Sequence, residues 1–329
     1  MRAIRIERYG GVEVMEDRDL PVPVPGHDEA LVRVACAGVN FMDVHTRQGK
    51  YARSRTYPVR LPVVLGMEGA GTIVDVGPSV AALRPGDRVA WCLSWGSYAE
   101  YAAVPASRLA RIPDGIDFDL AAAAFFQGCT AHYLCHDVGQ LGAGRSCLVH
   151  AGSGGIGQLL IQLAKHAGAT VFSTASTAEK AAVAQRCGAD HVMLYDAGRF
   201  PERIREITGG EGVDVVFDAV GRKTLRDSFR AARTRGLVVN FGSVSGPVDD
   251  LDPIELGEAG SLFLTRPRLA DYLADAQMVQ RRSEALFARL LDGSLRILMG
   301  APHTFDDVAD AHQALEERRQ IGKSVLRIQ

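Results

Sequence analysis

Between residues 147 and 242, short apolar runs alternate with segments whose apolar residues recur at helical spacing. The apolar runs predict buried strands at 147–149, 170–173, 192–195, 213–220 and 237–241. The helical spacings predict helices at 156–164, 179–187 and near 202–207. Buried strands that alternate with helices predict a parallel, doubly wound sheet of the Rossmann type in an α/β protein.

The first ~120 residues follow a different pattern. Alternating strand-like segments, such as 30–34 and 71–76, are separated by turns rich in proline and glycine. This pattern is typical of a small antiparallel β domain. The strand-like segment 323–328 is expected to return to it. We therefore expect a β domain at 1–122, completed by 298–329, and a dinucleotide-binding domain at 123–297.

A glycine-rich turn follows the first strand of the central segment. Gly152, Gly154 and Gly157 fit the pattern G-x-G-x-x-G, between an apolar run and a helical pattern. In that context the first glycine permits the turn, the second lets backbone N–H groups approach a pyrophosphate, and the third lets the helix pack on the strand. The phosphates then lie at the positive end of the helix dipole. The flanking elements favour a dinucleotide site over an ordinary glycine-rich loop.

Composition indicates a soluble enzyme and excludes some other classes. The net charge of −2 gives no reason to expect binding to nucleic acid or to an acidic membrane surface. No segment approaches the ~20 consecutive apolar residues of a membrane span, and the N-terminus lacks a signal-peptide core. The six cysteines form no C-x-x-C pair, which is typical of buried thiols in a reducing cytoplasm.

Motifs along nearly the whole chain carry a family resemblance. They include Gly38–Asp43, Leu65–Gly71, Pro85–Val89, Gly96–Tyr101, Gln127–Leu134, the glycine turn, Leu264–Pro267 and Gly322–Leu326. Together they resemble the quinone oxidoreductase (zeta-crystallin) branch of the medium-chain dehydrogenase/reductase superfamily. The resemblance implies a GroES-like catalytic domain built from both chain ends, a Rossmann domain, and a homodimer formed through the Rossmann domains.

The resemblance also bears on metal binding. Zinc-dependent relatives place a cysteine where this chain has Asn40 and a histidine where it has Met67. Catalytic zinc needs three protein ligands from Cys, His or carboxylate, so we expect no metal. We expect no pair of histidines at the helical spacing of a metal site, and a structural role for Asp43 and Glu68.

The second strand of the Rossmann segment indicates the cofactor. NAD sites usually place an acid about 20 residues beyond the first glycine, whereas Ser173–Thr177 contains none. Glu179 is assigned to the helix start, in a capping box with Ser176. In NADPH-using relatives, the lysine matching Lys180 faces the 2′-phosphate together with small hydroxyl residues. The combination favours NADPH.

By the family pattern, Asn40 and Thr130 lie beside the nicotinamide and its ribose, and Tyr195 flanks the adenosine. His45 and Tyr51 face the substrate and are candidate proton donors, although a role in the pocket wall is the stronger expectation. The candidate catalytic residues are Asn40, His45, Tyr51 and Thr130. The candidate cofactor residues are Asn40, Thr130, Gly152, Gly154, Gly155, Ile156, Gly157, Thr174, Ser176, Lys180, Tyr195, Val220, Phe241, Gly242, Ser243, Arg266, Arg318 and Lys323.

The chain departs from the family pattern in a run of basic residues at 47–60. It contains Arg47, Lys50, Arg53, Arg55 and Arg60 and no acidic residue. This segment is either a solvated loop or a rim that attracts anionic substrates, and the sequence leaves both interpretations open. We expect a metal-free reductase that transfers hydride from NADPH to a quinone or an activated enone. One alternative is an enoyl-thioester reductase, in which the basic run at 47–60 would bind the phosphates of the substrate. The other is a crystallin-like cofactor-binding protein without turnover.

Overall fold

The computed structural model describes residues 1–195 and 199–328, which form two compact units. The first unit comprises residues 1–129 and 273–329, and the second unit comprises residues 130–272. The predicted borders were 122/123 and 297/298. Helix α9 (Ala276–Leu291) belongs to the first unit, because its Phe287 ring packs 6.0 Å from the ring of Phe125 and its Leu286 packs against Gly128.

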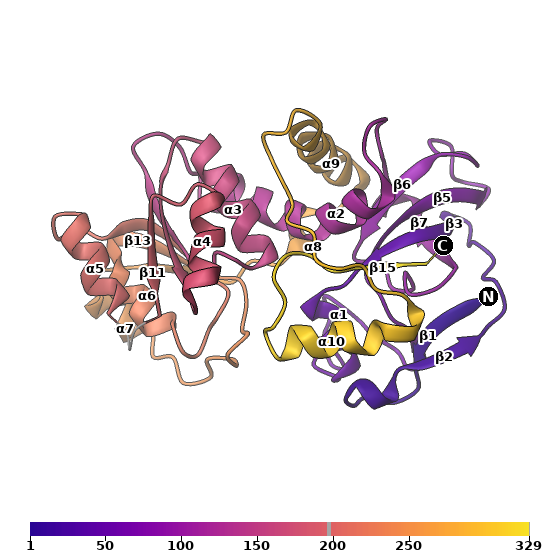
Figure 1. The fold of residues 1–329 in the computed structure, drawn as a ribbon, viewed down its shortest axis with the longest axis horizontal. Helices are drawn as coiled ribbons and strands as arrows, with labels where there is room; N and C mark the ends of the chain where they lie inside the picture. The colour runs from indigo at the N-terminus through magenta and orange to yellow at the C-terminus, as the bar shows by residue number, and fades with distance from the viewer. Residues whose placement is uncertain (196–198, 329) are drawn as a thin grey trace. The chain divides into compact units, whose positions relative to one another are not determined.

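The second unit contains the predicted parallel sheet, in the strand order β11-β10-β9-β12-β13-β14. Figure 1 shows α3 and α4 on one side of this sheet and α5 and α6 on the other. The strands are β9 (Ser146–Val149), β10 (Thr170–Ala175), β11 (His191–Leu194), β12 (Val213–Asp218), β13 (Ala232–Asn240) and β14 (Phe263–Thr265). The helices are α3 (Gly155–His166), α4 (Ala178–Arg186), α5 (Phe200–Ile207), α6 (Leu225–Ala231), α7 (Ile254–Glu258) and α8 (Leu269–Tyr272). The strand order reverses beside β9, which is where a doubly wound sheet binds its ligand.

Register brings three turns to one edge of this sheet. Val149, Phe217 and Val239 are neighbours across β9, β12 and β13. Because the strands are parallel, the segments that follow them emerge at the same carboxyl edge. The sequence predicted this grouping of the glycine turn with Gly221 and with the segment that begins at Phe241.

The first unit is built on two antiparallel sheets. The larger has the order β15-β3-β5-β6-β8, with β7 also paired to β3, and the smaller has the order β2-β1-β4. The strands are β1 (Arg2–Ile6), β2 (Glu16–Asp19), β3 (Glu29–Gly38), β4 (Val63–Val64), β5 (Glu68–Val76), β6 (Arg88–Cys92), β7 (Tyr101–Pro105), β8 (Ala110–Arg111) and β15 (Val325–Arg327). The pairing of β15 with β3 confirms that the C-terminal segment returns to this unit.

Besides α9, the longer helices of the first unit are α1 (Phe41–Arg47) and α10 (Val308–Glu316). Helix α2 (Phe118–Tyr133) begins in the first unit and ends in the second. A search of the described helices found none with the length and apolar character of a membrane span.

Candidate active site and cofactor site

The glycine turn is too tightly packed to accept side chains at two of its positions. A Cβ atom at Gly152 would lie 2.0 Å from Oγ of Ser173, and one at Gly157 would lie 2.5 Å from the carbonyl oxygen of Ala151. Ala151 itself has a left-handed φ of 53°. Glycine is therefore required for the strand, the turn and the helix to approach this closely.

The turn leads into the amino end of α3, a suitable place for phosphate. Gly154 is the N-cap residue and has no side chain to cap the helix. The N–H groups of the first turn, at Gly155, Ile156 and Gly157, therefore remain available to an anion. The helix dipole adds to the attraction.

The end of β10 presents hydroxyl groups and no carboxylate. Ser176 is exposed, and the Thr177 side chain accepts a hydrogen bond of 3.2 Å from the backbone N–H of Lys180. Thr177 is therefore the N-cap of α4, and the predicted capping box of Ser176 with Glu179 is wrong. A box starting at Ser176 would place the helix start one residue too early, since α4 begins at Ala178.

A buried histidine connects the glycine turn to the neighbouring strands. His150 Nδ1 lies 2.8 Å from Thr174 Oγ1 and 2.8 Å from the Tyr195 hydroxyl, and Nε2 lies 3.0 Å from Ser228 Oγ. Ser228 donates its proton to Asp218 or to a backbone carbonyl, so it accepts from Nε2–H and leaves Nδ1 as the acceptor. Burial lowers the pKa of His150 and keeps the ring neutral.

This arrangement changes the interpretation of several residues. His150 was not among the predicted site residues, but it is only 1% exposed and holds Thr174 and Tyr195 in place. Thr174 is fully buried with its hydroxyl engaged by His150. The one feature of the sequence that could have indicated this role is the position of His150, a polar residue between the apolar run 147–149 and Gly152.

The second turn at this edge is organised by a buried carboxylate. Oδ1 of Asp218 accepts from the backbone N–H groups of Val220 and Gly221 at 2.8 and 2.9 Å. A Cβ atom at Gly242 would lie 2.4 Å from the carbonyl oxygen of Ala219, so the loop after β13 packs directly on this turn. The predicted residues Val220 and Phe241–Ser243 therefore lie together.

Arg266 holds the loop after β13. Its Nη1 donates to the carbonyl oxygens of Asn240 and Gly242, at 3.0 and 3.1 Å, and also to the Asn240 side chain. Nη1 is therefore committed to positioning this loop.

Thr130, near the end of α2, is 5% exposed.

The first unit contains a buried polar cluster, which we call the Asn40–Glu68–Lys323 cluster. Lys323 Nζ donates to Asn40 Oδ1 at 2.7 Å and to Glu68 Oε2 at 2.8 Å, and Asn40 Nδ2 donates to Glu68 Oε2 at 2.8 Å. Each of the three residues is at most 2% exposed. The ammonium, the carboxylate and the amide therefore neutralise and orient one another.

The cluster follows from the sheet register. Asn40 follows β3, Glu68 begins β5 and Lys323 precedes β15, and these are neighbouring strands. A Cβ atom at Gly38 would lie 2.1 Å from Glu68 Oε2, so glycine is needed at that position. Lys323 was predicted to touch the cofactor, but the structure directs its ammonium to protein oxygens.

Asp43 lies beside this cluster and has a structural environment, as expected. Its carboxylate accepts from the backbone N–H groups of Asn40 at 2.9 Å and Met67 at 3.0 Å. Burial raises the pKa of Asp43 to about 7, although the Asn40 hydrogen bond opposes the shift. Asp43 joins the start of α1 to the turn before β5.

Four half-buried aromatic rings extend from the start of α1. Successive ring centroids of Phe41, His45, Tyr51 and Tyr57 lie 6.1, 6.1 and 5.6 Å apart. We call this row the aromatic strip. Burial, helped by the charge of Lys50, lowers the pKa of His45 to about 4. His45 is therefore neutral near pH 7, where it can donate a hydrogen bond but does not act as an imidazolium acid.

The structure corrects two further expectations. His132 and His136 lie one helical turn apart, with ring centroids separated by 4.6 Å, so a histidine pair at helical spacing does exist. Within residues 1–195 and 199–328, no three His, Cys, Asp or Glu side chains group as metal ligands.

Arg47 is fully buried and its Nη2 lies 2.7 Å from Glu316, so it is not part of a basic rim. Arg318 has a left-handed φ of 58° at the end of α10.

Comparison with known proteins establishes the family. The alcohol dehydrogenase GroES-like domain matches residues 26–114, and the zinc-binding dehydrogenase domain matches residues 155–272. A quinone oxidoreductase of Pseudomonas aeruginosa is 37% identical over 99% of both chains. The chain belongs to the quinone oxidoreductase family of medium-chain dehydrogenases/reductases.

Two further comparisons describe the range of this family. A 2-haloacrylate reductase of a Burkholderia species is 36% identical and covers 98% of this chain and 97% of its own. The crystal structure of the Escherichia coli quinone oxidoreductase complexed with NADPH superposes with a TM-score of 0.94, at 35% identity, over 99% of this chain and 100% of that one. The resemblance read from the sequence is confirmed.

Proposed function

We propose that this protein is a metal-free, NADPH-dependent reductase of quinones and of activated α,β-unsaturated carbonyl compounds. The Asn40–Glu68–Lys323 cluster carries the metal-free part of the proposal. Lys323 and Asn40 already occupy Glu68 Oε2, and Lys323 occupies Asn40 Oδ1. An amide oxygen and the neighbouring Met67 thioether are poor replacements for the Cys, His and carboxylate ligands of catalytic zinc. A buried ammonium here opposes the binding of a second cation.

The residues of the second unit fit a dinucleotide. We propose that the glycine turn and the first turn of α3 hold the pyrophosphate, with Val220 and Phe241–Ser243 at the nicotinamide end. Thr130 and Asn40 are assigned to the nicotinamide side, and Tyr195 and Arg318 to the adenosine and phosphate side. Thr174, Arg266 and Lys323 act indirectly, because their polar atoms hold other residues of the site.

NADPH, when bound, supplies a hydride. The acceptor is already electrophilic, so the protein needs only to orient it and to stabilise the oxyanion that forms. A hydrogen bond from the Tyr51 hydroxyl or from neutral His45 supplies that stabilisation. Solvent delivers the proton, since the pKa of His45 is about 4.

The choice of NADPH rests on the end of β10, and Lys180 provides its test. We expect NADPH to bind at least about tenfold more tightly than NADH at low salt, because a charge-assisted hydrogen bond contributes about 1.5–3 kcal/mol. Lys180→Ala should remove most of this preference and leave NADH affinity unchanged, whereas Lys180→Arg should retain it. Fluorescence titration with both cofactors measures the difference. Equal affinities for the two cofactors in the wild type would contradict the assignment.

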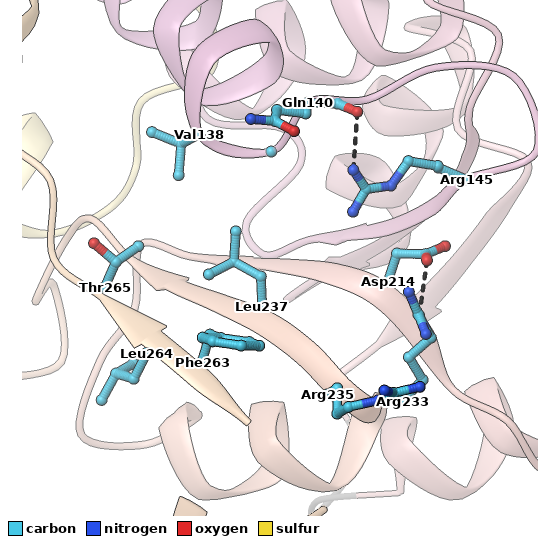
Figure 2. A pocket seen from close by; sticks show the side chains of 11 residues that line it. Val138, Gln140, Arg145, Asp214, Arg233, Arg235, Leu237, Phe263, Leu264 and Thr265 are labelled. Carbon is cyan, nitrogen blue, oxygen red and sulfur yellow. Dashed lines mark hydrogen bonds and ion pairs between the residues drawn. The ribbon is translucent and has the colours of Figure 1, made fainter. Parts of the chain in front are cut away.

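We also propose that the protein forms a homodimer through β14. This strand ends the described sheet, and its Phe263 side chain is 63% exposed. Figure 2 shows Phe263 beside Leu237 and Leu264, with the Arg233–Asp214 ion pair nearby. These residues line a pocket of about 580 Å³. An exposed edge strand with an apolar side chain is suited to pair with the same strand of a second copy.

Light scattering tests the dimer. Phe263→Glu should give a monomer, because it places a carboxylate on the strand edge that pairs. Ile254→Glu is a matched control, since Ile254 is also 65% exposed but lies on α7. Monomers in the wild type, or a dimer that survives the Phe263 change, would overturn this interface.

We propose a cytoplasmic location. All six cysteines are free and five are buried. Burial raises the pKa of Cys129 to about 12, which keeps this thiol protonated and inert. Free, buried thiols are typical of a reducing compartment.

A further inference from the structure

The segment that follows α1 carries unpaired positive charge next to the candidate substrate residues. Lys50, Arg53, Arg55 and Arg60 are exposed, and none of them makes an ion pair or a side-chain hydrogen bond to another described residue. We call these four side chains the basic segment. No acidic residue occurs between Asp43 and Glu68 in the sequence. The basic segment therefore has a net charge of +4 that the fold does not neutralise.

Several other exposed arginines of this protein are neutralised. Arg2 and Arg226 each contact two carboxylates, and Arg327 contacts Asp119. Their side chains are 42–55% exposed, so exposure alone does not prevent pairing. The basic segment differs from these three in gathering four such charges between residues 50 and 60 with no acidic residue among them, and an external anion is the partner that its charge favours.

The basic segment is held by local turns beside the aromatic strip. The N–H of Ala52 donates to the carbonyl of Gly49, that of Ser54 to the carbonyl of Tyr51, and that of Tyr57 to the hydroxyl of Ser54. Arg53 and Arg55 therefore lie on a short folded loop between the last two rings of the strip. The field of Lys50 reaches the strip, since it contributes to the lowered pKa of His45.

The order of these features along the first unit suggests how a substrate is bound. The strip begins at Phe41, directly after Asn40, and passes through three ring contacts to Tyr57. Flat conjugated groups pack well on such rings. A substrate with an anionic group at one end and a flat reacting group at the other can therefore contact both the basic segment and the strip.

We propose that the basic segment binds the phosphates of an α,β-unsaturated thioester carried on a phosphorylated carrier, of the coenzyme A type. This inference rests on the proposed reductase function and names a substrate class for it. In the reaction, the β-carbon of the thioester gains a hydride from NADPH, the α-carbon gains a proton from solvent, and the products are the saturated thioester and NADP⁺. Arginine is well suited to phosphate because its planar fork binds two oxygens at once.

Two substrates with the same reacting group test the proposal. Crotonyl-CoA and crotonyl-pantetheine share the enoyl thioester, but only the former carries phosphates. We expect the wild type to show a kcat/KM about tenfold higher for crotonyl-CoA at low salt, and the advantage to shrink at 0.5 M salt as exposed charges are screened. The triple variant R53Q/R55Q/R60Q should lose this advantage. Its kcat/KM for either thioester should equal the kcat/KM of the wild type for crotonyl-pantetheine.

Two controls make the test specific. The triple variant R18Q/R84Q/R203Q removes the same charge from side chains that are 55–84% exposed elsewhere, and it should keep the preference for crotonyl-CoA. With 2-chloroacrylate, whose carboxylate adjoins the double bond, R53Q/R55Q/R60Q should match the wild type. The proposal is overturned if the wild type has the same kcat/KM for the two thioesters, or if both triple variants lose the preference for crotonyl-CoA. It is also overturned if R53Q/R55Q/R60Q changes kcat/KM for 2-chloroacrylate only.

Binding of coenzyme A itself separates this inference from the proposed function. If neither thioester nor a quinone is reduced, the reductase proposal fails, and calorimetry still tests the basic segment. Weaker binding of coenzyme A to R53Q/R55Q/R60Q than to the wild type supports the phosphate site. Equal binding, or no binding to the wild type at low salt, overturns it.

Discussion

Replacing Lys323 with methionine should lower the free energy of unfolding by about 3–5 kcal/mol, because it leaves the carboxylate of Glu68 buried without its cation. Glu68 is 0% exposed and Lys323 is 1% exposed, so water cannot solvate the remaining charge. Denaturation with urea at pH 7 measures the change.

The double variant K323M/E68Q distinguishes a charge effect from a loss of packing. It removes both charges and should recover much of the stability, since an uncharged pair avoids the cost of a lone buried ion. If K323M alone costs less than about 1 kcal/mol, the range of an exposed ion pair, the Asn40–Glu68–Lys323 cluster is not the tight buried pair described above.

Gly157→Ala should weaken NADPH binding by about 10–100-fold, the loss expected when a charge-assisted hydrogen bond of about 1.5–3 kcal/mol to the pyrophosphate is broken. The new Cβ would lie 2.5 Å from the carbonyl oxygen of Ala151, and a backbone atom cannot turn aside as a side chain can. The start of α3 must then move away from the turn that holds the pyrophosphate.

Gly257→Ala is the matched control for this glycine. A Cβ at Gly257 would meet nothing within 4 Å, and its φ is not left-handed. We expect wild-type affinity for NADPH from this variant in the same titration. An equal affinity in Gly157→Ala, with circular dichroism showing a folded protein, would contradict the role given to the turn.

The sequence predicted the parallel sheet and its glycine turn because their signals are local. A buried strand reads as an apolar run, and Gly152, Gly154 and Gly157 stand at a spacing that few other structures require. The C-terminal strand was also predictable, since Val325 and Leu326 are apolar and strand-like. The contacts of helix α9 with Phe125 and Gly128 join residues that are distant in sequence, so no local signal could predict them.

The roles of individual polar residues depended on contacts that the sequence does not show. Lys323 is more than 280 residues from Asn40, and only the pairing of β15 with β3 brings them together. Arg47 belongs to a basic run in the sequence, but the fold turns it inward toward Glu316. No sequence motif marks His150, because its partners Thr174, Tyr195 and Ser228 come from three other segments.

The capping of α4 shows the limit of a motif at short range. Ser176 and Glu179 have the spacing of a capping box, and Thr177 and Lys180 lie one residue further on. Both threonine and serine are good N-cap residues, so the sequence offers two starting points. The structure selects Thr177, and the exposed hydroxyl of Ser176 remains available to a ligand.

The central claim is that this protein reduces its substrate with NADPH and without a metal. The most direct test is to treat the protein with a chelator, show by elemental analysis that it is metal-free, and follow NADPH oxidation with a simple quinone. We expect full turnover, together with no oxidation of simple alcohols, because zinc-dependent relatives use the metal to lower the pKa of the alcohol and Asn40 and Met67 do not supply zinc ligands. Activity that disappears with the chelator and returns with zinc would contradict the account.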